Sequence, residues 1–314
     1  MAQQNHSAVT EFILLGFPGS PYLQISLFLI FLLMYIVTFL GNMAIIILVV
    51  TYRRLHTPMY FFLVNLSFLE ICYTTTSAPK ALAIFLGKSK TISLTGCLLQ
   101  IYFGFSFGCT EYCLLSVMAY DRYLAICYPL RYSTIMNSSL SIQLAVGSWV
   151  SGFLVMALLL SLISQLSFCG PNIIDHFHCE KNSLIVLSCT DISIIQILDL
   201  ALSVIVILGS CVITLLSYVY IISTVLKIPS RKGQQKALST CSSHLAVVLL
   251  WYVSTILLFV KPSARHSLEL TKTVNIINTI VTPLLNPFIY ALRNKEMKEA
   301  MQNILRGSPV ITSE

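Results

Sequence analysis

Met118-Ala-Tyr-Asp-Arg-Tyr123 places an acid and an arginine side by side at the end of a long apolar run. From Leu98 to Tyr120 this run is almost uncharged. An isolated charge deep in lipid costs several kcal/mol, about 2.5–3.5 on insertion scales. A pair at the end of a membrane helix instead reaches the aqueous interface and can act on a partner there. The stretch therefore predicts a membrane helix whose charged end carries a function.

The composition of the whole chain agrees with a membrane protein. Hydrophobic residues make up 56% of the 314 residues and charged residues only 10%, against about 25% charged in soluble domains. The mean hydropathy is +0.84. These values disfavour a soluble enzyme.

Apolar runs of about 20 residues can cross the ~30 Å hydrocarbon core of a bilayer. Seven such runs occur, at residues 25–52, 59–86, 94–123, 140–164, 195–226, 237–260 and 270–292. We expect an all-α membrane protein, one seven-helix bundle over residues 1–314. Residues 1–24 lack the basic start of a signal peptide. No internal repeat supports the inverted halves typical of transporters.

Lysine and arginine predict the orientation, because positively charged loops stay on the cytoplasmic side. Residues 1–24 contain neither, whereas twelve of the nineteen follow the first, third and fifth runs or lie in the tail. These twelve are Arg53, Arg54, Arg122, Arg131, Lys227, Arg231, Lys232, Lys236, Arg293, Lys295, Lys298 and Arg306. We expect a multi-pass plasma-membrane protein with its N-terminus outside. Asn5-His6-Ser7 is then an N-glycosylation site.

The ten cysteines fall into two groups. Cys97, Cys169, Cys179 and Cys189 lie on the expected outer side, in an oxidising compartment. Four cysteines allow three pairings, which this reasoning leaves open. The others lie in the runs or at their inner ends, where a thiol packs as a small apolar group. Three of the outer four fall in the loop over 165–194, and we expect this long loop to form an ordered lid.

The third run can be followed along its length. From Cys97 to Arg122 is 25 residues, or about 37 Å at the rise of an α-helix. The helix therefore reaches from the outer cysteine to the cytoplasmic side. One face of it carries residues at helical spacing, either lining a pocket or packing as ordinary core: Ile101, Phe105, Gly108, Cys109 and Tyr112.

Several motifs follow one another along the chain. They are Gly41-Asn42, Leu55-His-Thr-Pro-Met-Tyr-Phe-Phe-Leu63, Met118-Ala-Tyr-Asp-Arg-Tyr-Leu-Ala-Ile-Cys127, Pro129-Leu-Arg-Tyr132, Ser217-Tyr218, Lys236-Ala-Leu-Ser-Thr-Cys-Ser-Ser-His-Leu245 and Pro283-Leu-Leu-Asn-Pro-Phe-Ile-Tyr-Ala-Leu-Arg-Asn294. With seven runs, this order resembles the rhodopsin-like G-protein-coupled receptors, and more narrowly the tetrapod-type olfactory (odorant) receptors. The sequence differs from the usual family motifs at Leu124, Leu238 and Trp251. In each case one apolar residue replaces another.

The resemblance implies a receptor that binds a small volatile odorant and activates a stimulatory G protein, which raises cAMP. By linkage, odorant and G protein stabilise the same conformation. In the family pattern Asp121 holds Arg122 in the inactive state, and on activation Tyr218 and Tyr290 pair around the released arginine. Anchoring at the membrane interface is the alternative role of the two tyrosines.

Further switch residues follow from the same motifs. Tyr123 completes the charged triplet. His244 supplies either a pH-sensitive contact or a packing histidine. Pro287 breaks a backbone hydrogen bond that Asn286 can satisfy again, which makes either a hinge or a kink needed for packing.

The resemblance also places the ligand pocket in the outer half of the bundle. The expected lining is Phe105, Gly108, Cys109, Tyr112, Leu202, Ser203, Val206, Ile207, Tyr252, Thr255, Ile256, Phe259, Ile276 and Thr279. This wall is apolar with a few hydroxyls and carries no Asp or Lys. It favours small, neutral, lipophilic guests over amines and carboxylates, at modest affinity.

Glu70 and Glu111 are carboxylates within the second and third runs. Acids inside a membrane face the bundle interior and have a partner. Either they bind a cation, as in the family's allosteric sodium pocket, or one is protonated and hydrogen-bonded, for instance to Asn42, Asn286 or Ser116. A proton relay is a weaker alternative.

The lid carries one further candidate site and two implied bridges. The resemblance implies the disulfides Cys97–Cys179 and Cys169–Cys189. His176, His178 and Glu180 alternate, so in an extended strand they share one side and match the ligands of copper or zinc. Oxidation of the neighbouring cysteine makes a metal site the lesser alternative.

The cytoplasmic surface is basic, which attracts anionic lipids by about 1 kcal/mol per basic residue. A G-protein footprint overlaps the same surface, and we expect no nucleic-acid partner. The segment after Arg293 predicts a short amphipathic helix on the membrane. Its apolar residues at helical spacing are Met297, Ala300, Met301, Ile304 and Leu305.

Other classes of membrane protein fit less well. A transporter or ion-coupled protein would need a buried lysine or a polar file through the core. A membrane enzyme would need a metal triad or a nucleophile with its base inside the runs, where His244 is the only histidine. A receptor used outside the nose keeps the mechanism and changes only the physiological role.

Overall fold

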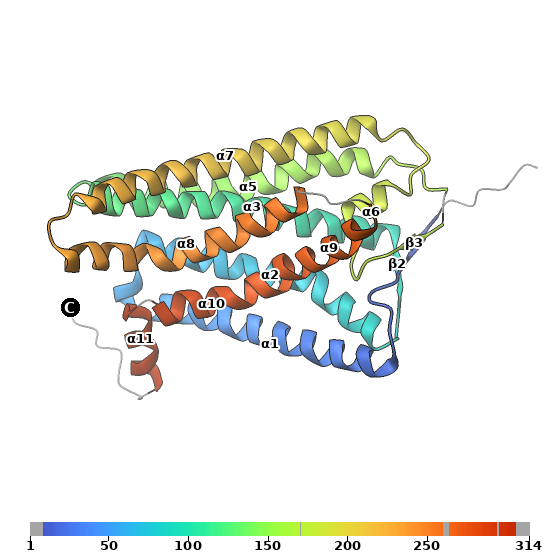
Figure 1. Ribbon diagram of the computed structural model, residues 1–314, viewed down its shortest axis with the longest axis horizontal. Coiled ribbons are helices and arrows are strands. Elements are labelled where there is room, and N and C mark those ends of the chain that lie inside the picture. Colours follow the sequence, from blue (N-terminus) through green and yellow to red (C-terminus); the bar gives the residue numbers. More distant parts are fainter. Residues whose placement is uncertain (1–8, 170, 260–263, 294, 306–314) are drawn as a thin grey trace, which may run out of the picture.

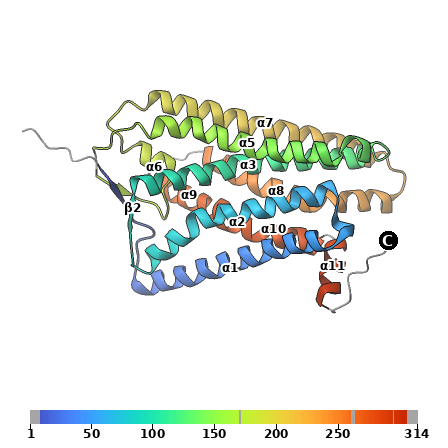
Figure 2. The same cartoon turned by 180° about the vertical axis from the view of Figure 1, so that it is seen from behind.

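The structure is a computed structural model that describes residues 9–169, 171–259, 264–293 and 295–305. Its long helices lie side by side in one bundle, with short strands at one end and helix α11 across the other (Figure 1). The view from behind has the same arrangement (Figure 2). We call the two ends of the bundle the lid end and the α11 end.

Each expected run corresponds to a helix or a continuous helical segment. They are α1 (Pro21–Thr51), α2 (Pro58–Phe85), α3 (Leu94–Cys127), α5 (Ser138–Ile163), α7 (Ser193–Leu226), α8 (Arg231–Phe259) and the run α9 (Ala264–Ile276), η2 (Ile277–Val281) and α10 (Thr282–Arg293). Among the described residues, α1, α3, α5 and α7 are long and apolar enough to cross a membrane by composition alone. The others carry more polar side chains, as α2 does with buried Glu70.

The helix ends follow local sequence signals. Ser20 caps α1, with Pro21 in the first turn, where proline loses no hydrogen bond. Ser93 caps α3 by accepting a hydrogen bond from the Gly96 amide at 3.1 Å. At its other end α3 continues past the charged triplet to Cys127, just before Pro129. The Asp121–Arg122 pair therefore lies inside the helix rather than at its end.

The bundle exposes apolar side chains on its outer face and buries three carboxylates. Leu33 on α1 is 63% exposed and Leu208 on α7 is 56% exposed. Glu70, Glu111 and Asp121 are fully buried. This distribution suits a protein surrounded by lipid. Exposing an apolar side chain to lipid costs no free energy, whereas exposing a charged one costs several kcal/mol.

Helix α3 lies at the centre and packs against α2, α5, α7 and α8. A glycine permits its closest approach to α5. A Cβ on Gly152 would lie 2.7 Å from the Ser106 carbonyl oxygen and 2.8 Å from the Thr110 amide nitrogen, both backbone atoms of α3. The two backbones can be this close only because residue 152 has no side chain.

The lid end is closed by a small sheet and two disulfides. Strand β1 (Glu11–Leu14) pairs antiparallel with β2 (Thr91–Ser93) and parallel with β3 (Ile173–Ile174). The disulfide Cys97–Cys179 joins α3 to the segment between α5 and α7, and Cys169–Cys189 closes that segment on itself. We call this segment, residues 164–192, the lid; it includes the short helix α6 (Lys181–Ile185).

The α11 end carries three short helical elements. These are η1 (Arg53–Leu55), α4 (Tyr132–Ile135) and α11 (Lys295–Leu305). Met297 and Ala300 on α11 are buried against the bundle. The Tyr60 hydroxyl of α2 donates a hydrogen bond to the Glu296 carboxylate at 2.7 Å, which fixes α11 across the helix ends.

Candidate functional site

A cavity of about 760 Å³ lies below the lid, among α2, α3, α5, α7, α8 and the α9–η2 run. Ten of the fourteen residues expected at the ligand pocket line this cavity. They are Phe105, Gly108, Cys109, Tyr112, Leu202, Ser203, Val206, Ile207, Thr255 and Thr279. The structure thus brings most of the predicted set together, while a bound ligand remains a prediction.

The floor of the cavity joins α3 to α8. Trp251 of α8 is 2% exposed, and its ring centre lies 5.6 Å from that of Tyr112 on α3. The Tyr112 and Thr255 hydroxyls share a hydrogen bond. A ligand that reaches this floor contacts both helices at once.

The rim of the cavity is charged. Lys181 at the start of α6 forms an ion pair with Asp199 of α7. The neighbouring Glu180 caps α6 by accepting hydrogen bonds from the Ser183 amide at 2.6 Å and the Ser183 hydroxyl at 2.9 Å. The rim therefore contains a cation and two carboxylates, whereas the floor and most of the wall are uncharged.

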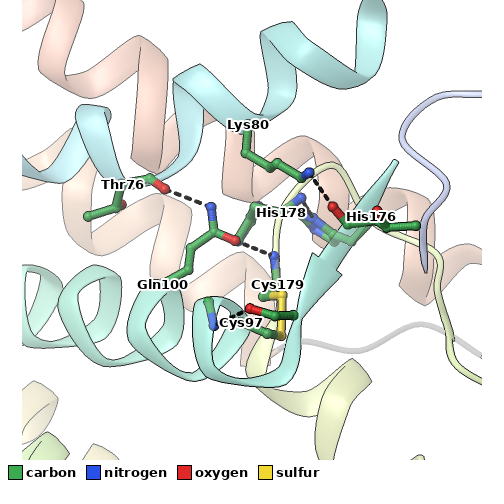
Figure 3. Close-up of a disulfide and its surroundings, with 10 residues drawn as sticks. Thr76, Lys80, Cys97, Gln100, His176, His178 and Cys179 are labelled. Atoms are coloured by element: carbon green, nitrogen blue, oxygen red, sulfur yellow. Dashed lines mark hydrogen bonds between the residues drawn. A yellow bond between two sulfur atoms is a disulfide. The ribbon is translucent and has the colours of Figure 1, made fainter. Parts of the chain in front are cut away.

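The lid is held above the cavity by more than its disulfide, as Figure 3 shows. The side chain of Gln100 on α3 donates to the Thr76 carbonyl of α2 at 2.6 Å and accepts from the Cys179 amide at 2.9 Å. One amide group thus ties α2, α3 and the lid together beside Cys97–Cys179. On the other side of the lid, Lys272 of α9 donates to Asp175 at 2.6 Å.

Toward the α11 end, α3 carries the charged pair. Arg122 Nε donates to Asp121 Oδ2 at 3.0 Å, and the Tyr132 hydroxyl of α4 donates to Asp121 Oδ1 at 2.7 Å. Asp121 is fully buried and Arg122 is 7% exposed. The expectation of a pair at an aqueous interface is therefore wrong for this conformation, because α3 runs on beyond it and α4 covers it.

A second polar connection lies between this pair and the cavity. The Tyr218 hydroxyl of α7 lies 2.7 Å from His244 Nδ1 of α8, and the two rings stack. His244 Nε2 lies 3.1 Å from the Leu115 carbonyl oxygen of α3. Both ring nitrogens are engaged, so this histidine links three helices.

Comparison with known proteins decides the class. The family model described as "Olfactory receptor" matches residues 31–307. The chain belongs to the olfactory receptor family. It is 60% identical to Olfactory receptor 6F1 of Homo sapiens over 96% of this chain and 98% of that protein. It is 57% identical to Olfactory receptor 287 of Rattus norvegicus, over 97% and 98%, and 48% identical to Olfactory receptor 6B1 of Homo sapiens, over 97% of each.

These comparisons confirm the family predicted from the motifs. The protein is an odorant receptor of the seven-helix, G-protein-coupled class, and not an enzyme. The family implies odorant ligands and coupling to a G protein. The transporter and enzyme alternatives are therefore dropped.

Three expected pocket residues of the receptor, Tyr252, Ile256 and Ile276, do not line the cavity. Ile256 is 56% exposed on the outer face of α8, and the Tyr252 hydroxyl instead donates to the Ser210 hydroxyl at 2.8 Å. Trp251 and Thr255, four residues apart, occupy the wall, so their neighbours in sequence turn away. Ile276 packs near the lid in another cluster. The Phe259 side chain lies outside the described residues.

The expectation of a wall without Asp or Lys is wrong. Asp199 and Lys181 both line the cavity of the receptor. Asp199 could have been identified, because it is the single charged residue of the run 195–226 and acids inside a membrane face the bundle interior. Lys181 could not, because no periodic pattern places a loop residue over a cavity.

The copper or zinc site at His176, His178 and Glu180 is also wrong. The backbone bends here instead of extending, and the amides of Phe177 and His178 donate to His176 Nδ1 at 3.0 and 3.4 Å. Glu180 is engaged at α6. Among the described residues, no group of three His, Cys, Asp or Glu side chains could hold a metal ion. Burial lowers the pKa of His178 to about 4 and that of His176 further, so both are neutral at pH 7.

Glu70 and Glu111 lie together in the bundle interior. Glu70 accepts a hydrogen bond from the Asn286 side chain and interacts with Glu111. In the described part of the chain, no partner donates to either oxygen of Glu111, to Asn42 Oδ1 or to Asn286 Oδ1. Glu70, Glu111 and Asn286 thus form a buried group with oxygen atoms that lack donors, which fits a cation or a proton.

The remaining predicted switch residues lie in different surroundings. Tyr290 is 1% exposed, and its hydroxyl has no hydrogen-bond partner in the part of the chain that the structure describes. Tyr123 is half-buried and packs against the rings of Tyr128 and Tyr220, apart from the ion pair. Pro287 lies inside α10. Asn5 falls outside the described residues.

Proposed function

We propose that the receptor binds small, neutral, lipophilic volatiles in the cavity below the lid and activates a stimulatory G protein, which raises cAMP. The observation that carries the proposal is that α3 joins the cavity floor to the buried ion pair, and α8 joins the floor to His244. Tyr112 and Arg122 both lie on α3, about 15 Å apart along the helix axis. Trp251 and His244 both lie on α8.

The proposed coupling runs through the contacts between these two points. A ligand on Trp251 and Tyr112 changes how α8 packs on α3, and a shift of α8 breaks the contact of His244 with Leu115. Movement of α8 away from α3 opens the α11 end of the bundle. Arg122 then leaves Asp121 and contacts the G protein, with Tyr218 and Tyr290 pairing around it.

The cavity sets the class of ligand. Its volume of about 760 Å³ lies within the range of small-molecule sites. The ten lining residues named above, with Trp251, form the proposed contact set. They offer mostly apolar surface and a few hydroxyls, so we expect modest affinities for small guests.

We further propose that the receptor is a plasma-membrane protein with the lid end outside and the α11 end in the cytoplasm. The lysine and arginine distribution supports this orientation, and the lid disulfides agree with it, because disulfides persist outside the cell. Asn5 would carry the glycan. The basic α11 end would contact anionic lipids and the G protein.

A sodium ion is proposed as an allosteric ligand of the interior oxygen cluster. Glu70, Glu111, Asn42 and Asn286 would hold it, since they supply buried oxygen atoms without donors. When bound, the ion would supply the positive charge that these carboxylates lack. We expect sodium, but not N-methylglucamine, to raise the thermal stability of the purified receptor, and Glu111→Gln to abolish this difference.

The proposed function is tested by cAMP output in cells that express the receptor and are exposed to a panel of volatiles. Arg122→Ala is expected to abolish the response at equal surface expression. Lys88→Ala, which removes one exposed positive charge at the lid end, is the matched control and should respond normally. An intact response in Arg122→Ala would overturn the coupling role.

A further inference from the structure

The rim of the cavity contains a lysine whose positive charge is balanced by a neighbouring carboxylate. Lys181 is 5% exposed, and its ammonium pairs with Asp199 Oδ1 and lies 4.6 Å from the centre of the Phe105 ring. All three residues line the cavity. They come from the lid, α7 and α3, so three separate segments meet at this one group.

The ammonium has more donors than the protein uses. A lysine has three N–H donors and no acceptor. Among the described residues, Asp199 accepts one hydrogen bond from Nζ, and the Phe105 ring face offers electrostatic attraction but no lone pair. In the part of the chain that the structure describes, two N–H groups of the ammonium therefore have no protein acceptor, and they face a cavity where a ligand can supply one.

We infer that Lys181 and Asp199 form a polar subsite that selects ligands carrying a carbonyl oxygen: aldehydes, ketones and esters with an apolar tail. The inference rests on the proposed function and adds the ligand's polar group to it. A carbonyl oxygen has two lone pairs and no proton. It can accept both remaining N–H groups and leaves no donor of its own to be satisfied.

The charges at the rim exclude ionic ligands. A carboxylate that reached Lys181 would lie beside Asp199 and Glu180, so two like charges would oppose one favourable contact. An amine would meet Asp199 already paired and Lys181 as a second cation. A neutral acceptor gains the hydrogen bonds without either repulsion.

The rest of the wall accommodates the tail. Below the rim the cavity is lined by Phe105, Leu202, Val206 and Ile207, and it ends at Trp251. A linear or branched hydrocarbon fits along this surface while its oxygen stays at the rim. The polar end of the ligand would thus contact the lid and α7, and its apolar end would contact α8.

The test compares linear compounds of one chain length: octanal, octanone, octanol, octane, octanoate and octylamine. Two measurements are made on each, cAMP output in cells and the rise in thermal unfolding temperature of the purified receptor. The second measures binding without coupling. A loss of cAMP with retained thermal shifts would therefore count against the proposed function and leave the subsite supported.

The decisive variant is Lys181→Met, which keeps the length and removes the ammonium, and Lys181→Arg keeps the charge. Lys272→Met is the matched control, because Lys272 is 6% exposed and pairs with Asp175 at 2.6 Å at the lid end without lining the cavity. It removes a buried lid ion pair of the same kind.

We expect octanal and octanone to be the strongest ligands, octanol intermediate, and octanoate and octylamine the weakest. Lys181→Met should weaken the carbonyl compounds by at least about tenfold and leave octane unchanged, while Lys181→Arg and Lys272→Met retain the preference. Equal ranking of carbonyl compounds and octane, or an unchanged preference in Lys181→Met, would overturn the inference. If Lys181→Met does not reach the surface, Asp199→Asn replaces it, and an octanoate response that stays the weakest there would contradict the charge argument.

Discussion

Gly152→Ala is the sharpest test of the packing between α3 and α5. The added Cβ would lie 2.7 Å from the Ser106 carbonyl oxygen and 2.8 Å from the Thr110 amide nitrogen. Ordinary contacts of a Cβ begin near 3.4 Å, so the helices must separate by roughly 0.7 Å to admit one methyl group. The Thr110 hydroxyl lies closer still and can turn away, but no rotamer change moves the two backbone atoms.

The expected cost follows from this geometry. Overpacking of a well-packed interface costs about 1–3 kcal/mol, and here the strain falls on the central helix. Alanine favours a helix over glycine by about 1 kcal/mol, which offsets part of it. We expect a net loss of about 0–2 kcal/mol for Gly152→Ala.

Gly147→Ala on the same helix supplies the reference. A Cβ there meets nothing within 4 Å, so the substitution should be neutral or stabilising by about 1 kcal/mol. Thermal unfolding of the two purified variants, side by side, measures the difference. If Gly152→Ala is as stable as Gly147→Ala, the close approach of α3 and α5 described above is incorrect.

Three further predictions concern the lid and the switch. Because burial lowers the pKa of His178 from 6.5 to about 4, the unfolded chain takes up a proton first as the pH falls. Burial lowers the pKa of His176 further, so both histidines contribute. Thermal stability should therefore fall as the pH drops below about 6.5, and His178→Gln should reduce the slope between pH 6.5 and 4 without removing it. Tyr132→Phe removes one hydrogen bond to buried Asp121 and should raise basal cAMP at equal expression; an unchanged baseline would contradict its role. Gln100→Leu leaves Cys97–Cys179 intact but frees the lid amide, and it should weaken ligand responses several-fold, whereas an unaltered dose response would show that the disulfide alone positions the lid.

Much of the fold was predictable because each segment that crosses lipid must be a helix of about 20 mostly apolar residues. The apolar run at 195–226 became α7 (Ser193–Leu226), and the run at 140–164 became α5 (Ser138–Ile163). The charged end of the third run was harder, since the helix continues to Cys127. Nothing in the apolar pattern signals a buried ion pair about one and a half turns before a helix ends.

The site was predictable only where the resemblance to the family indicated which face of a helix points toward the cavity. Phe105 and Tyr112 of α3 were placed correctly on the cavity wall, whereas Ile256 was placed one residue out of phase on α8. Strand β1 had no counterpart in the prediction, because a four-residue strand needs partners, and those of β1 lie about 80 and 160 residues later in the chain. Lys181 was missed because it lies in the lid, where no periodic pattern indicates which side chains face the cavity.

The position of β1 in the sheet also dictates an order of assembly. Phe12 and Leu14 are fully buried, yet Leu14 pairs with Ile174, about 160 residues later in the chain. At about 5–20 residues per second of synthesis, the first strand waits roughly 8–32 s for its last neighbour. During that interval the segment can pair with β2 but lacks β3 and the lid side chains that bury it. Closure of the lid is therefore a late event in the biogenesis of this receptor, and anything that sequesters residues 11–14 early would protect the nascent chain.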